Sequence, residues 1–305
     1  MTAWAQGRRL SVAVVGLGGV GGGAAGSLAA AGRHDIMACT RQSIARFTLE
    51  RAEGPVEAPL RILADPAQAK PVDWVLVCTK THQTAATGPW LARLCTPATR
   101  VAVLQNGIDQ IVRVSPLVGG ATIVPVLVYY NGERLAPDRV RIRHAGSFVA
   151  VVADDDPGRA FVDLFEGTPL RIIRSGDFAT LAWRKLLINA VANPITALTL
   201  QRQAVLRRSD IQDLCRGILD EAVAAARAEG VKLAEDETAR TIATLENFSG
   251  ELGTSMYFDR LAGHRVEVEA LTGAIVAAGD RHGMAMPLNR ALLTLLRAIN
   301  DAISA

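Results

Sequence analysis

A strand, a glycine-rich turn and a helix follow one another near the start of the chain, and no other stretch constrains the fold as strongly. Residues 11–15 have the pattern of a buried strand, Gly-Leu-Gly-Gly-Val-Gly occupies 16–21, and an alanine-rich run at 24–31 indicates a helix. In a G-x-G-x-x-G motif placed this way, the first glycine permits a tight turn, the second lets a pyrophosphate approach the backbone, and the third lets the helix pack on the strand. The N–H groups at the start of the helix would bind the phosphates. The sequence therefore predicts a dinucleotide-binding α/β domain.

The residues expected to contact the cofactor are those of this motif and a basic residue after the second strand. That strand is predicted at 35–40, and it ends in Thr-Arg-Gln-Ser, without the carboxylate that binds the ribose hydroxyls of NAD. Arg41 lies 20 residues past Gly21, and a guanidinium there matches a 2′-phosphate, so NADP is predicted. The alternative is that Arg41 is an ordinary surface residue. The motif residues are Gly16, Leu17, Gly18, Gly19, Val20 and Gly21.

Two further buried strands, predicted at 73–80 and 100–104, are followed by polar side chains. Ligands of open α/β sheets bind beyond the carboxyl ends of the strands, and Lys80 and Asn106 both stand at such ends. Taken singly, Lys80 also fits a solvent-facing loop, and Asn106 with Gly107 also fits a turn that needs a positive φ. Because both residues fall at the same predicted edge, we expect them to line the site.

The character of the chain changes near residue 175, from strands to helices. Before this point, the pieces expected to extend the first sheet are strands at 122–130, 139–143, 148–152 and 170–173, with a helix near 157–165. After it, helices are expected at 177–199, 209–230, 235–247, 263–282 and 287–303, the second of them starting with a capping box at Ser209. We therefore expect a Rossmann-type α/β domain over residues 1–175 and an all-α domain over 176–305.

The first helix of the second half carries three polar side chains on an otherwise apolar body. Lys185, Asn189 and Asn193 recur every four residues, so they share one face of the helix. The stripe is either the solvated face of an amphipathic helix or one wall of a polar binding site. Pro194 removes a backbone hydrogen bond, and a kink or break is expected beside it.

A carboxylate and a serine stand out in the C-terminal part. In the helix predicted at 263–282, Glu267 shares a face with apolar residues that should pack inward. An unpaired buried charge is costly, and Lys185 is the candidate cation to pair with it. Ser255 stands in a Gly-Thr-Ser-Met segment, and its spacing alone favours a helix N-cap.

Charge and cysteine content narrow the class of protein. The 305 residues include 33 basic and 30 acidic side chains and no basic tract with interleaved aromatic residues, so nucleic acid is not expected as a partner. The four cysteines form no C-x-x-C pair and have no histidines at metal-ligand spacing, so we expect no metal site and reduced thiols, which suit the cytoplasm. The first ten residues lack a signal-peptide core, and the apolar run at 12–31 has too many glycines for a membrane span. The apolar C-terminal helices allow a homodimer, but they also suit an ordinary core.

With these residues collected, the chain resembles the ketopantoate reductase (2-dehydropantoate 2-reductase) family over essentially its whole length. A Lys-x₃-Asn-x₃-Asn helix, with a serine and a glutamate at the right separation beyond it, is much more specific than the glycine motif. The family fold that this implies is a Rossmann-type domain followed by an all-α domain of the 6-phosphogluconate dehydrogenase C-terminal type. The segments that carry the resemblance are the glycine motif, Arg41, Cys-Thr-Lys-Thr-His-Gln at 78–83, Gln-Asn-Gly-Ile-Asp at 105–109, Trp-Arg-Lys-Leu at 183–186 with Asn189 and Asn193, Thr-Ser-Met at 254–256, and Glu267.

The resemblance implies the NADPH-dependent reduction of a 2-oxo acid, 2-dehydropantoate, to (R)-pantoate. Lys185 would be the general acid and Glu267 would orient and tune it. Because residues of both halves take part, the site is expected between the domains, with a hinge closing on it. The substrate would be held by Asn189, Asn193 and Ser255, with Lys80 and Asn106 bordering both substrate and nicotinamide ribose, and Gln83 near the adenine.

The sequence departs from the family pattern at two places. After Thr-Ser-Met it reads Tyr-Phe-Asp at 257–259 where Leu-Gln-Asp is frequent, and residues 199–203 lack the usual Asn-Gly-like pair. These departures do not affect the predicted reaction type, but they leave the identity of the 2-oxo acid open. One alternative is a related NADP-dependent hydroxyacid dehydrogenase acting on a different 2-oxo or 3-hydroxy acid. Another is a non-catalytic NADP-binding sensor, which would have no use for Lys185 and Glu267.

Overall fold

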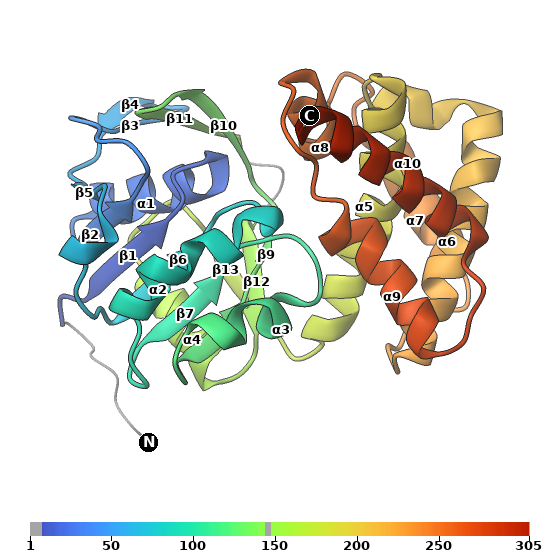
Figure 1. Ribbon diagram of the computed structural model, residues 1–305. Helices are drawn as coiled ribbons and strands as arrows, with labels where there is room; N and C mark the ends of the chain where they lie inside the picture. The colour runs from blue at the N-terminus through green and yellow to red at the C-terminus, as the bar shows by residue number, and fades with distance from the viewer. Residues whose placement is uncertain (1–7, 144–147, 305) are drawn as a thin grey trace. The chain divides into compact units, whose positions relative to one another are not determined.

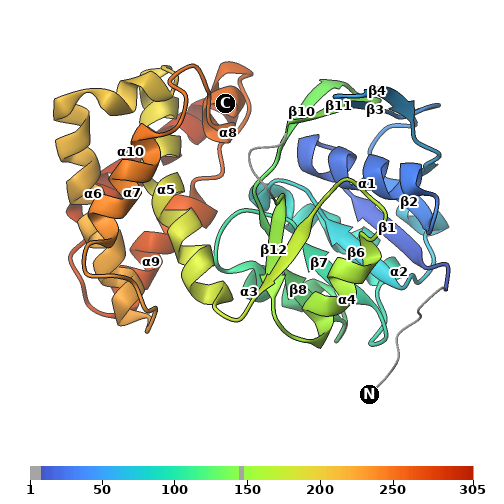
Figure 2. The ribbon, with the colours of Figure 1, turned by 180° about the vertical axis from the view of Figure 1, so that it is seen from behind.

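The computed structural model describes residues 8–143 and 148–304, and it is shown from two opposite sides in Figures 1 and 2. The chain divides into two compact units. Unit 1 consists of Met1–Asn106 and Gln110–Phe178, and unit 2 of Gly107–Asp109 and Ala179–Ala305. Unit 1 combines strands with helices, whereas the regular elements of unit 2 are helical throughout its described residues.

Six parallel strands form the main sheet of unit 1, called sheet A here (Figure 1). In their order across the sheet they are β5 (Arg61–Leu63), β2 (Asp35–Cys39), β1 (Ser11–Val15), β6 (Trp74–Val77), β7 (Arg100–Val103) and β8 (Thr122–Pro125). The chain runs outward from β1 to β2 and β5, and then returns to β6 on the other side of β1. The strand order therefore reverses between β1 and β6, as it does in doubly wound dinucleotide-binding domains. The predicted Rossmann-type fold is confirmed.

Helices cover both faces of sheet A, which explains why its strands are almost entirely apolar. Val12 and Val14 of β1 point into one core, and Ala13 and Val15 point into another, because successive strand residues face opposite ways. The first core also contains residues of α1 (Gly19–Ala31) and α4 (Asp156–Leu164), and the second contains residues of α2 (Gly88–Leu94) and α3 (Gln110–Val114). Short 3-10 helices lie at Pro66–Gln68, Thr81–Gln83, Ala85–Thr87 and Ser115–Leu117.

A second sheet, sheet B, packs on the side of α1 that faces away from sheet A (Figure 1). Its strands in order are β10 (Asn131–Ala136), β11 (Arg139–Arg143), β3 (Thr48–Arg51) and β4 (Gly54–Glu57). A Cβ atom at Gly22 would lie 2.6 Å from Val140 Cγ2, and one at Gly26 would lie 3.1 Å from Leu49 Cβ. Glycines along α1 therefore let the helix approach a second layer.

The expectation that the strands after residue 121 extend the first sheet is right for β8 and wrong for the others. The strands at 131–143 instead form sheet B together with β3 and β4, two strands that were not predicted from the sequence. A separate three-stranded sheet contains β13 (Ile172–Ser175), β12 (Ala150–Ala153) and β9 (Leu127–Val128). Strand pairing depends on contacts between residues far apart in the chain, as between Arg139 and Thr48, and a local pattern holds no information about them.

Unit 2 is built from six α-helices around one apolar core, as the all-α prediction required. They are α5 (Phe178–Thr199), α6 (Ser209–Ala228), α7 (Glu237–Glu246), α8 (Ser255–Leu261), α9 (Ala274–Arg281) and α10 (Pro287–Ser304), with a 3-10 helix at Gln203–Arg207. Helix α5 continues without a break through Pro194, because the residues around the proline are buried and packing holds the helix together.

Two local expectations in unit 2 are wrong. The single helix predicted at 263–282 is an irregular segment, a π-helix at Glu269–Gly273 and then α9. The backbone of Val266 bonds to the side chain of Asn300 rather than to its own helical turn. Helix α6 does begin at Ser209, but this serine is already helical and no side chain caps the helix, so the predicted capping box is absent.

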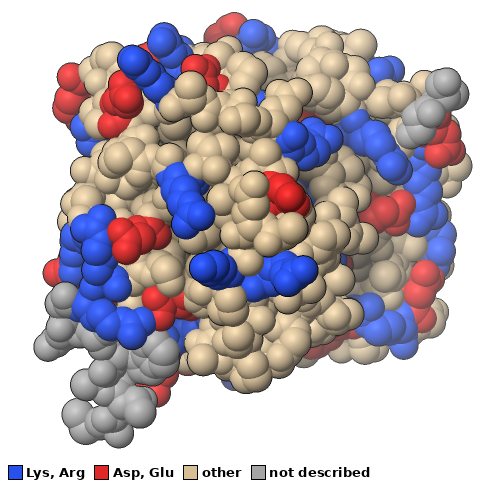
Figure 3. Space-filling model, turned by 60° about the vertical axis from the view of Figure 1, so that its left-hand side comes forward, with Lys and Arg blue, Asp and Glu red and all other residues tan. Residues whose placement is uncertain are grey.

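The surface and the thiols fit an ordinary globular protein. Figure 3 shows Lys and Arg side chains interspersed with Asp and Glu on one face. Within residues 8–143 and 148–304, no helix is long and apolar enough to cross a membrane, and no group of three His, Cys, Asp or Glu gathers as metal ligands do. Burial raises the pKa of the Cys39 thiol to about 12 and that of Cys95 to about 11, so these thiols stay protonated and unreactive.

Candidate active site

The three motif glycines have different roles in the turn between β1 and α1. Gly16 adopts a φ of 100°, and a Cβ there would lie 2.9 Å from Thr79 Cγ2. A Cβ at Gly21 would lie 1.9 Å from the carbonyl oxygen of Gly16, so helix and turn could not pack as they do. Around a Cβ at Gly18, by contrast, no atom beyond its chain neighbours lies within 4 Å. Gly18 is therefore the place where a phosphate can approach the backbone.

The remaining motif residues hold the turn against its surroundings. A Cβ at Gly19 would lie 1.8 Å from the carbonyl oxygen of Gly132 in β10, so Gly19 is needed for packing against sheet B. Leu17 is buried in the core beside α1. The carbonyl of Val20 accepts a hydrogen bond of 2.5 Å from the Tyr130 hydroxyl. Leu17 and Gly19 thus serve the fold, and what they can offer a phosphate is their backbone N–H groups.

Arg41 lies at the same edge of sheet A as the glycine turn. Strand β2 pairs with β1 so that Cys39 is level with Val15, and the Gly16 N–H donates to the Cys39 carbonyl at 3.3 Å. Arg41 follows two residues later and is exposed. Its guanidinium makes no hydrogen bond or ion pair with any other described residue. The side chain is therefore available to an anion that binds at the turn.

Lys80 and Asn106 also reach this edge, at equal distances from their strands. Val77 pairs with Val103 in the register of β6 and β7, so each residue stands three positions past its strand end. Both side chains are half-buried. Gln83 belongs to the short 3-10 helix that follows Lys80. Its backbone N–H donates a 2.9 Å hydrogen bond to the Lys80 carbonyl.

A buried glutamine that the sequence reasoning did not single out ties these two loops together. The Gln105 Nε2 group donates to the Thr79 carbonyl at 2.9 Å and to the Thr84 hydroxyl at 2.9 Å. Its Oε1 accepts from Arg113 at 2.9 Å. Gln105 thereby fixes the residues that precede Lys80 and Asn106. The sequence feature that could have pointed to Gln105 is its position directly after an apolar strand, at the edge where the site was expected.

The polar stripe on α5 is not a solvated face. Asn193 is 3% exposed, and Lys185 and Asn189 are half-buried. A stripe that served only solubility would stand open to water, whereas none of these three residues is exposed. The stripe therefore lines a polar environment within the protein.

Lys185 and Glu267 interact electrostatically in unit 2. Glu267 is 6% exposed, so the expected burial of this carboxylate is confirmed, although the helix on which the expectation rested is not formed there. Burial lowers the pKa of Lys185 to about 8, while the Coulombic attraction of Glu267 raises it. The balance of these two effects, which the sequence left open, is a lowered pKa. The ammonium is still the main form at pH 7, but it releases its proton much more easily than an ordinary lysine.

A chain of hydroxyl hydrogen bonds joins α5 to the start of α8. The Thr196 hydroxyl donates to the Ala192 carbonyl at 2.7 Å and lies 2.7 Å from the Thr254 hydroxyl. Because a hydroxyl has one proton, Thr196 must accept from Thr254, whose oxygen in turn accepts the Tyr257 N–H at 3.1 Å. Thr254 is thus the N-cap of α8, and Ser255, for which a cap was expected, is its exposed first residue.

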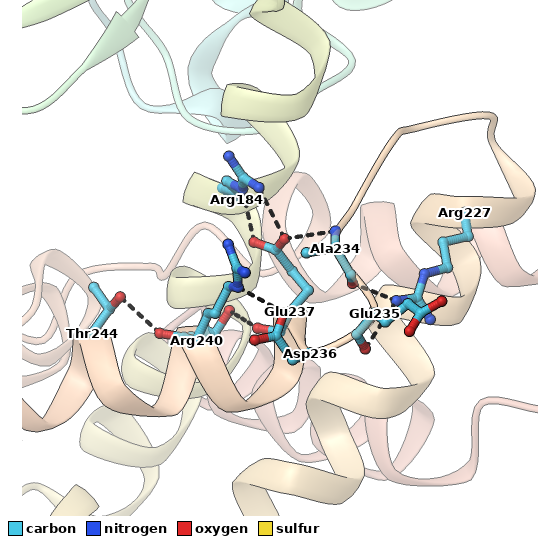
Figure 4. Close-up of polar contacts among 9 residues, drawn as sticks. Arg184, Arg227, Ala234, Glu235, Asp236, Glu237, Arg240 and Thr244 are labelled. Carbon is cyan, nitrogen blue, oxygen red and sulfur yellow. Dashed lines mark hydrogen bonds and ion pairs between the residues drawn. The ribbon is translucent and has the colours of Figure 1, made fainter.

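An ion pair holds the first half of α5 to α7 (Figure 4). The Arg184 guanidinium donates to both oxygens of Glu237, at 2.8 and 3.0 Å, and the Ala234 N–H donates to the same carboxylate at 3.1 Å. Burial of Glu237 raises its pKa, but these hydrogen bonds outweigh it and the pKa is lowered. Arg184 is therefore directed to α7, while the next residue, Lys185, interacts with Glu267.

The residues predicted from the sequence fall into two groups, one in each unit. The glycine turn, Arg41, Lys80, Gln83 and Asn106 gather at the carboxyl edge of sheet A in unit 1. In unit 2, α5 carries Lys185, Asn189 and Asn193, Glu267 lies just before the π-helix, and Ser255 is the first residue of α8. The first group can bind a dinucleotide phosphate, and the second offers a cation, a carboxylate and hydrogen-bonding side chains.

Both units match models of one protein family. The model described as ketopantoate reductase PanE/ApbA covers residues 12–154, and the model of its C-terminal part covers residues 177–300. The 2-dehydropantoate 2-reductase of Caulobacter vibrioides is 36% identical over 288 residues, which are 94% of this chain and 98% of that protein. The 2-dehydropantoate 2-reductase of Mycobacterium tuberculosis is 35% identical over 292 residues, or 95% of this chain and 98% of that protein.

Solved structures agree with this similarity. A PanE/ApbA family ketopantoate reductase from Ralstonia eutropha superposes with a TM-score of 0.87 at 28% identity, covering 97% of this chain and all of that one (100%). A ketopantoate reductase from Staphylococcus aureus, described as dimeric, superposes with a TM-score of 0.85 at 26% identity, covering 96% of this chain and 100% of that one.

Proposed function

Because the chain belongs to the ketopantoate reductase family, we propose that it reduces 2-dehydropantoate to (R)-pantoate, a step of pantothenate and coenzyme A biosynthesis. The chain is an oxidoreductase that uses NADPH and acts on the CH–OH group of its product. The observation that carries the proposed mechanism is the pairing of half-buried Lys185 with buried Glu267, with the pKa of Lys185 at about 8. A non-catalytic sensor would have no use for a lysine tuned in this way.

In the proposed mechanism, Lys185 protonates the ketone oxygen as the carbonyl carbon is reduced. Bound NADPH would supply the hydride from C4 of its nicotinamide. The electron pair of the C=O π bond moves to the oxygen, and the Lys185 ammonium first stabilises the negative charge and then gives up a proton. The neutral amine regains a proton from solvent for the next cycle. Glu267 keeps the ammonium oriented and raises the share that is protonated.

The neighbouring side chains of unit 2 suit the binding of an α-oxo carboxylate. Asn189 and Asn193 lie one and two turns along α5 from Lys185, so they can donate to carboxylate and hydroxyl oxygens on the same side of the helix. We assign Ser255 to the same task, because the Thr196–Thr254 contact ties its helix to α5. Lys80 and Asn106 of unit 1 would meet the substrate next to the nicotinamide ribose.

The cofactor groups proposed for unit 1 follow from the edge of sheet A. Backbone N–H groups of residues 16–21 would bind the pyrophosphate, with Gly18 as the point of close approach. Arg41 would bind the 2′-phosphate, and Gln83 would lie toward the adenine. Hydride and proton must reach the same carbonyl group, so the reaction requires residues of both units.

A second candidate function is the reduction of a different 2-oxo acid by the same chemistry. Phe258, at a position where the chain departs from the family pattern, is 50% exposed and stands three residues after Ser255, on the same side of α8. Its ring packs across Gly253, where a Cβ would lie 2.8 Å from the ring carbons. An aromatic side chain held there would suit a larger apolar substituent than the one in 2-dehydropantoate.

The deciding experiment is a substrate panel followed by loss of NADPH absorbance. We expect 2-dehydropantoate to be reduced with a higher kcat/KM than other 2-oxo acids, with NADH in place of NADPH as the control for the cofactor. A higher kcat/KM for an aryl or long-chain 2-oxo acid would favour the second candidate. Binding of NADPH without reduction of any 2-oxo acid would contradict both.

A further inference from the structure

Glu267 lies between two residues that α10 holds by side-chain contacts. The Val266 N–H donates to Asn300 Oδ1 at 2.8 Å, and Asn300 Nδ2 donates back to the Val266 carbonyl at 3.0 Å. On the other side of Glu267, the carboxylate of Glu269 accepts two hydrogen bonds of 2.8 Å from Arg297. Arg297 and Asn300 are three residues apart and so share one face of α10.

Of these two contacts, the one through Asn300 is the stronger candidate for fixing Glu267. Asn300 is 6% exposed and Val266 is 1% exposed, so their hydrogen bonds are shielded from water. The segment 263–268 is irregular, and without the carboxamide the buried N–H of Val266 would lose its partner. The side chains of Arg297 and Glu269 are 54% and 63% exposed, and an ion pair in water stabilises little.

We propose that Asn300 is a positioning residue for the reduction, because it fixes the backbone next to Glu267 and so holds this carboxylate beside the Lys185 ammonium. This proposal rests on the proposed function for the role of Lys185 as the proton donor. In this proposal Asn300 acts through the backbone of Val266, the residue before Glu267.

The proposal has an electrostatic consequence at Lys185. Glu267 is the charged group whose attraction raises the pKa of Lys185, while Arg184 is directed to Glu237 and Glu269 to Arg297. The attraction between two charges weakens with distance and with the entry of water. If Asn300 no longer holds the segment, Glu267 moves more freely and the pKa of Lys185 falls below about 8.

The chain allows this pKa to be measured directly. It has only four lysines, at positions 70, 80, 185 and 232, so a protein labelled with ¹³C-lysine should give four side-chain signals. The variant is Asn300→Leu, which keeps the size of the side chain and removes both hydrogen bonds. The matched control is Asn289→Leu, because Asn289 is also a buried asparagine of α10, but its carboxamide bonds to Ile218 and Glu221.

We expect Asn300→Leu to lower the pKa of Lys185 by about half a unit or more and Asn289→Leu to leave it unchanged, since about one unit corresponds to the loss of a close charge partner. In a Glu267→Gln background, Asn300→Leu should have no further effect, because its influence passes through Glu267. If Asn300→Leu does not fold by circular dichroism, Asn300→Ser, which is too short to make both bonds, should give a shift in the same direction.

An unchanged Lys185 titration in a folded Asn300 variant would overturn the proposal, and so would an equal shift in Asn289→Leu. The NMR titration needs no turnover, so it separates this inference from the proposed function. Failure of the wild type to reduce any 2-oxo acid contradicts the function alone. A normal titration in an Asn300 variant of an active enzyme contradicts the positioning role alone.

Discussion

Lys185 is the residue on which the account depends, and its chemistry could not be supplied by arginine. Of the 33 basic residues only four are lysines, and two of these, Lys80 and Lys185, stand at positions predicted for the site. An arginine stays protonated at any accessible pH, whereas the pKa of a lysine responds to burial and to neighbouring charges. If Lys185 is the proton donor, as proposed, arginine could not take its place.

The pH dependence of the reduction follows from the direction of this pKa shift. The reaction needs the ammonium form, so kcat/KM should be level below about pH 8 and fall roughly tenfold per pH unit above it. Because Glu267 raises the pKa, Glu267→Gln should move this basic limb to lower pH by about one unit. Steady-state rates between pH 6 and 10 measure both effects. A limb that stays in place in Glu267→Gln would separate the carboxylate from the acid.

Arg41 should determine the preference for NADPH over NADH. A lost charge-assisted contact to a phosphate costs about 1.5–3 kcal/mol, so Arg41→Ala should weaken NADPH binding by about 10- to 100-fold. NADH, which has no 2′-phosphate, should be affected by less than about threefold. Fluorescence titration gives both Kd values, and Arg46→Ala, another exposed arginine of the same loop region, is the control for net charge. Equal losses for the two cofactors would remove Arg41 from the phosphate site.

Single residues could be predicted from the sequence where their role depends on neighbours along the chain. The spacing of Gly16, Gly18 and Gly21 predicted the turn, because the turn itself is local: Gly16 adopts a positive φ, and a Cβ at Gly21 would meet the carbonyl oxygen of Gly16. Glu267 was expected to be buried and is, yet the helix used to argue this does not form there. Asn300 carried no signal at all, because its partner lies 34 residues away and a polar residue in an amphipathic helix is unremarkable by itself.

At the scale of elements, α5 is the helix that organises unit 2. Its polar stripe continues past Asn193 to Thr196, which lies in line with Lys185 because 11 residues make about three turns. Arg184 ties the first half of α5 to α7, and Thr196 ties its end to α8. The proposed substrate groups thus stand on a helix that is held on both sides of them.

The Thr196 contact gives a prediction for substrate binding. Thr196→Val keeps the shape of the side chain but leaves the Thr254 hydroxyl without its acceptor, so the start of α8 and Ser255 should shift. We expect KM for the 2-oxo acid to rise about tenfold, the effect of one lost buried hydrogen bond, with kcat changed by less than about threefold. Thr241→Val is the matched control, because this buried helical threonine bonds only to the Glu237 carbonyl in its own helix among the described residues. The same rise in KM for both variants would argue against a specific role for Thr196.

Helices and strands with a periodic sequence pattern were predicted correctly, whereas elements that form through packing against distant segments were not. Helices α4, α5, α6, α7 and α10 lie close to their expected positions, because each has a clear apolar period or end signals. Strands β3 and β4 were missed, since short half-exposed strands have little pattern of their own. Strand β3 pairs with β11, and β4 pairs with β3. The π-helix at Glu269–Gly273, which packs against α10, was also missed.

At the scale of the whole molecule, the strand order of sheet A explains why the fold and the site residues of unit 1 could be predicted from the sequence. A parallel sheet with a glycine turn after its first strand has few possible topologies, and each strand end then falls at one edge. Sheet B and the three-stranded sheet add contacts between distant segments of the chain. They leave the carboxyl ends of the strands of sheet A where the sequence predicts them. We therefore propose the division of labour that the reaction requires, with the cofactor bound by unit 1 and the proton supplied by unit 2.

The similarity to a dimeric reductase extends the account to assembly. Light scattering of the purified protein tests whether this chain also forms a homodimer. We expect activity to depend on Lys185 in either state, because its partner Glu267 comes from the same chain.

The most direct test of the central claim is the rate of hydride transfer in a single turnover, with enzyme in excess over 2-dehydropantoate, for Lys185→Ala against the wild type. NADPH absorbance at pH 7 reports this step alone, and fluorescence titration shows that the cofactor still binds. If Lys185 is the proton donor, the rate should fall by about 10²- to 10⁴-fold while the Kd for NADPH changes by less than about threefold. A Lys185→Ala rate within about threefold of the wild type would contradict the account.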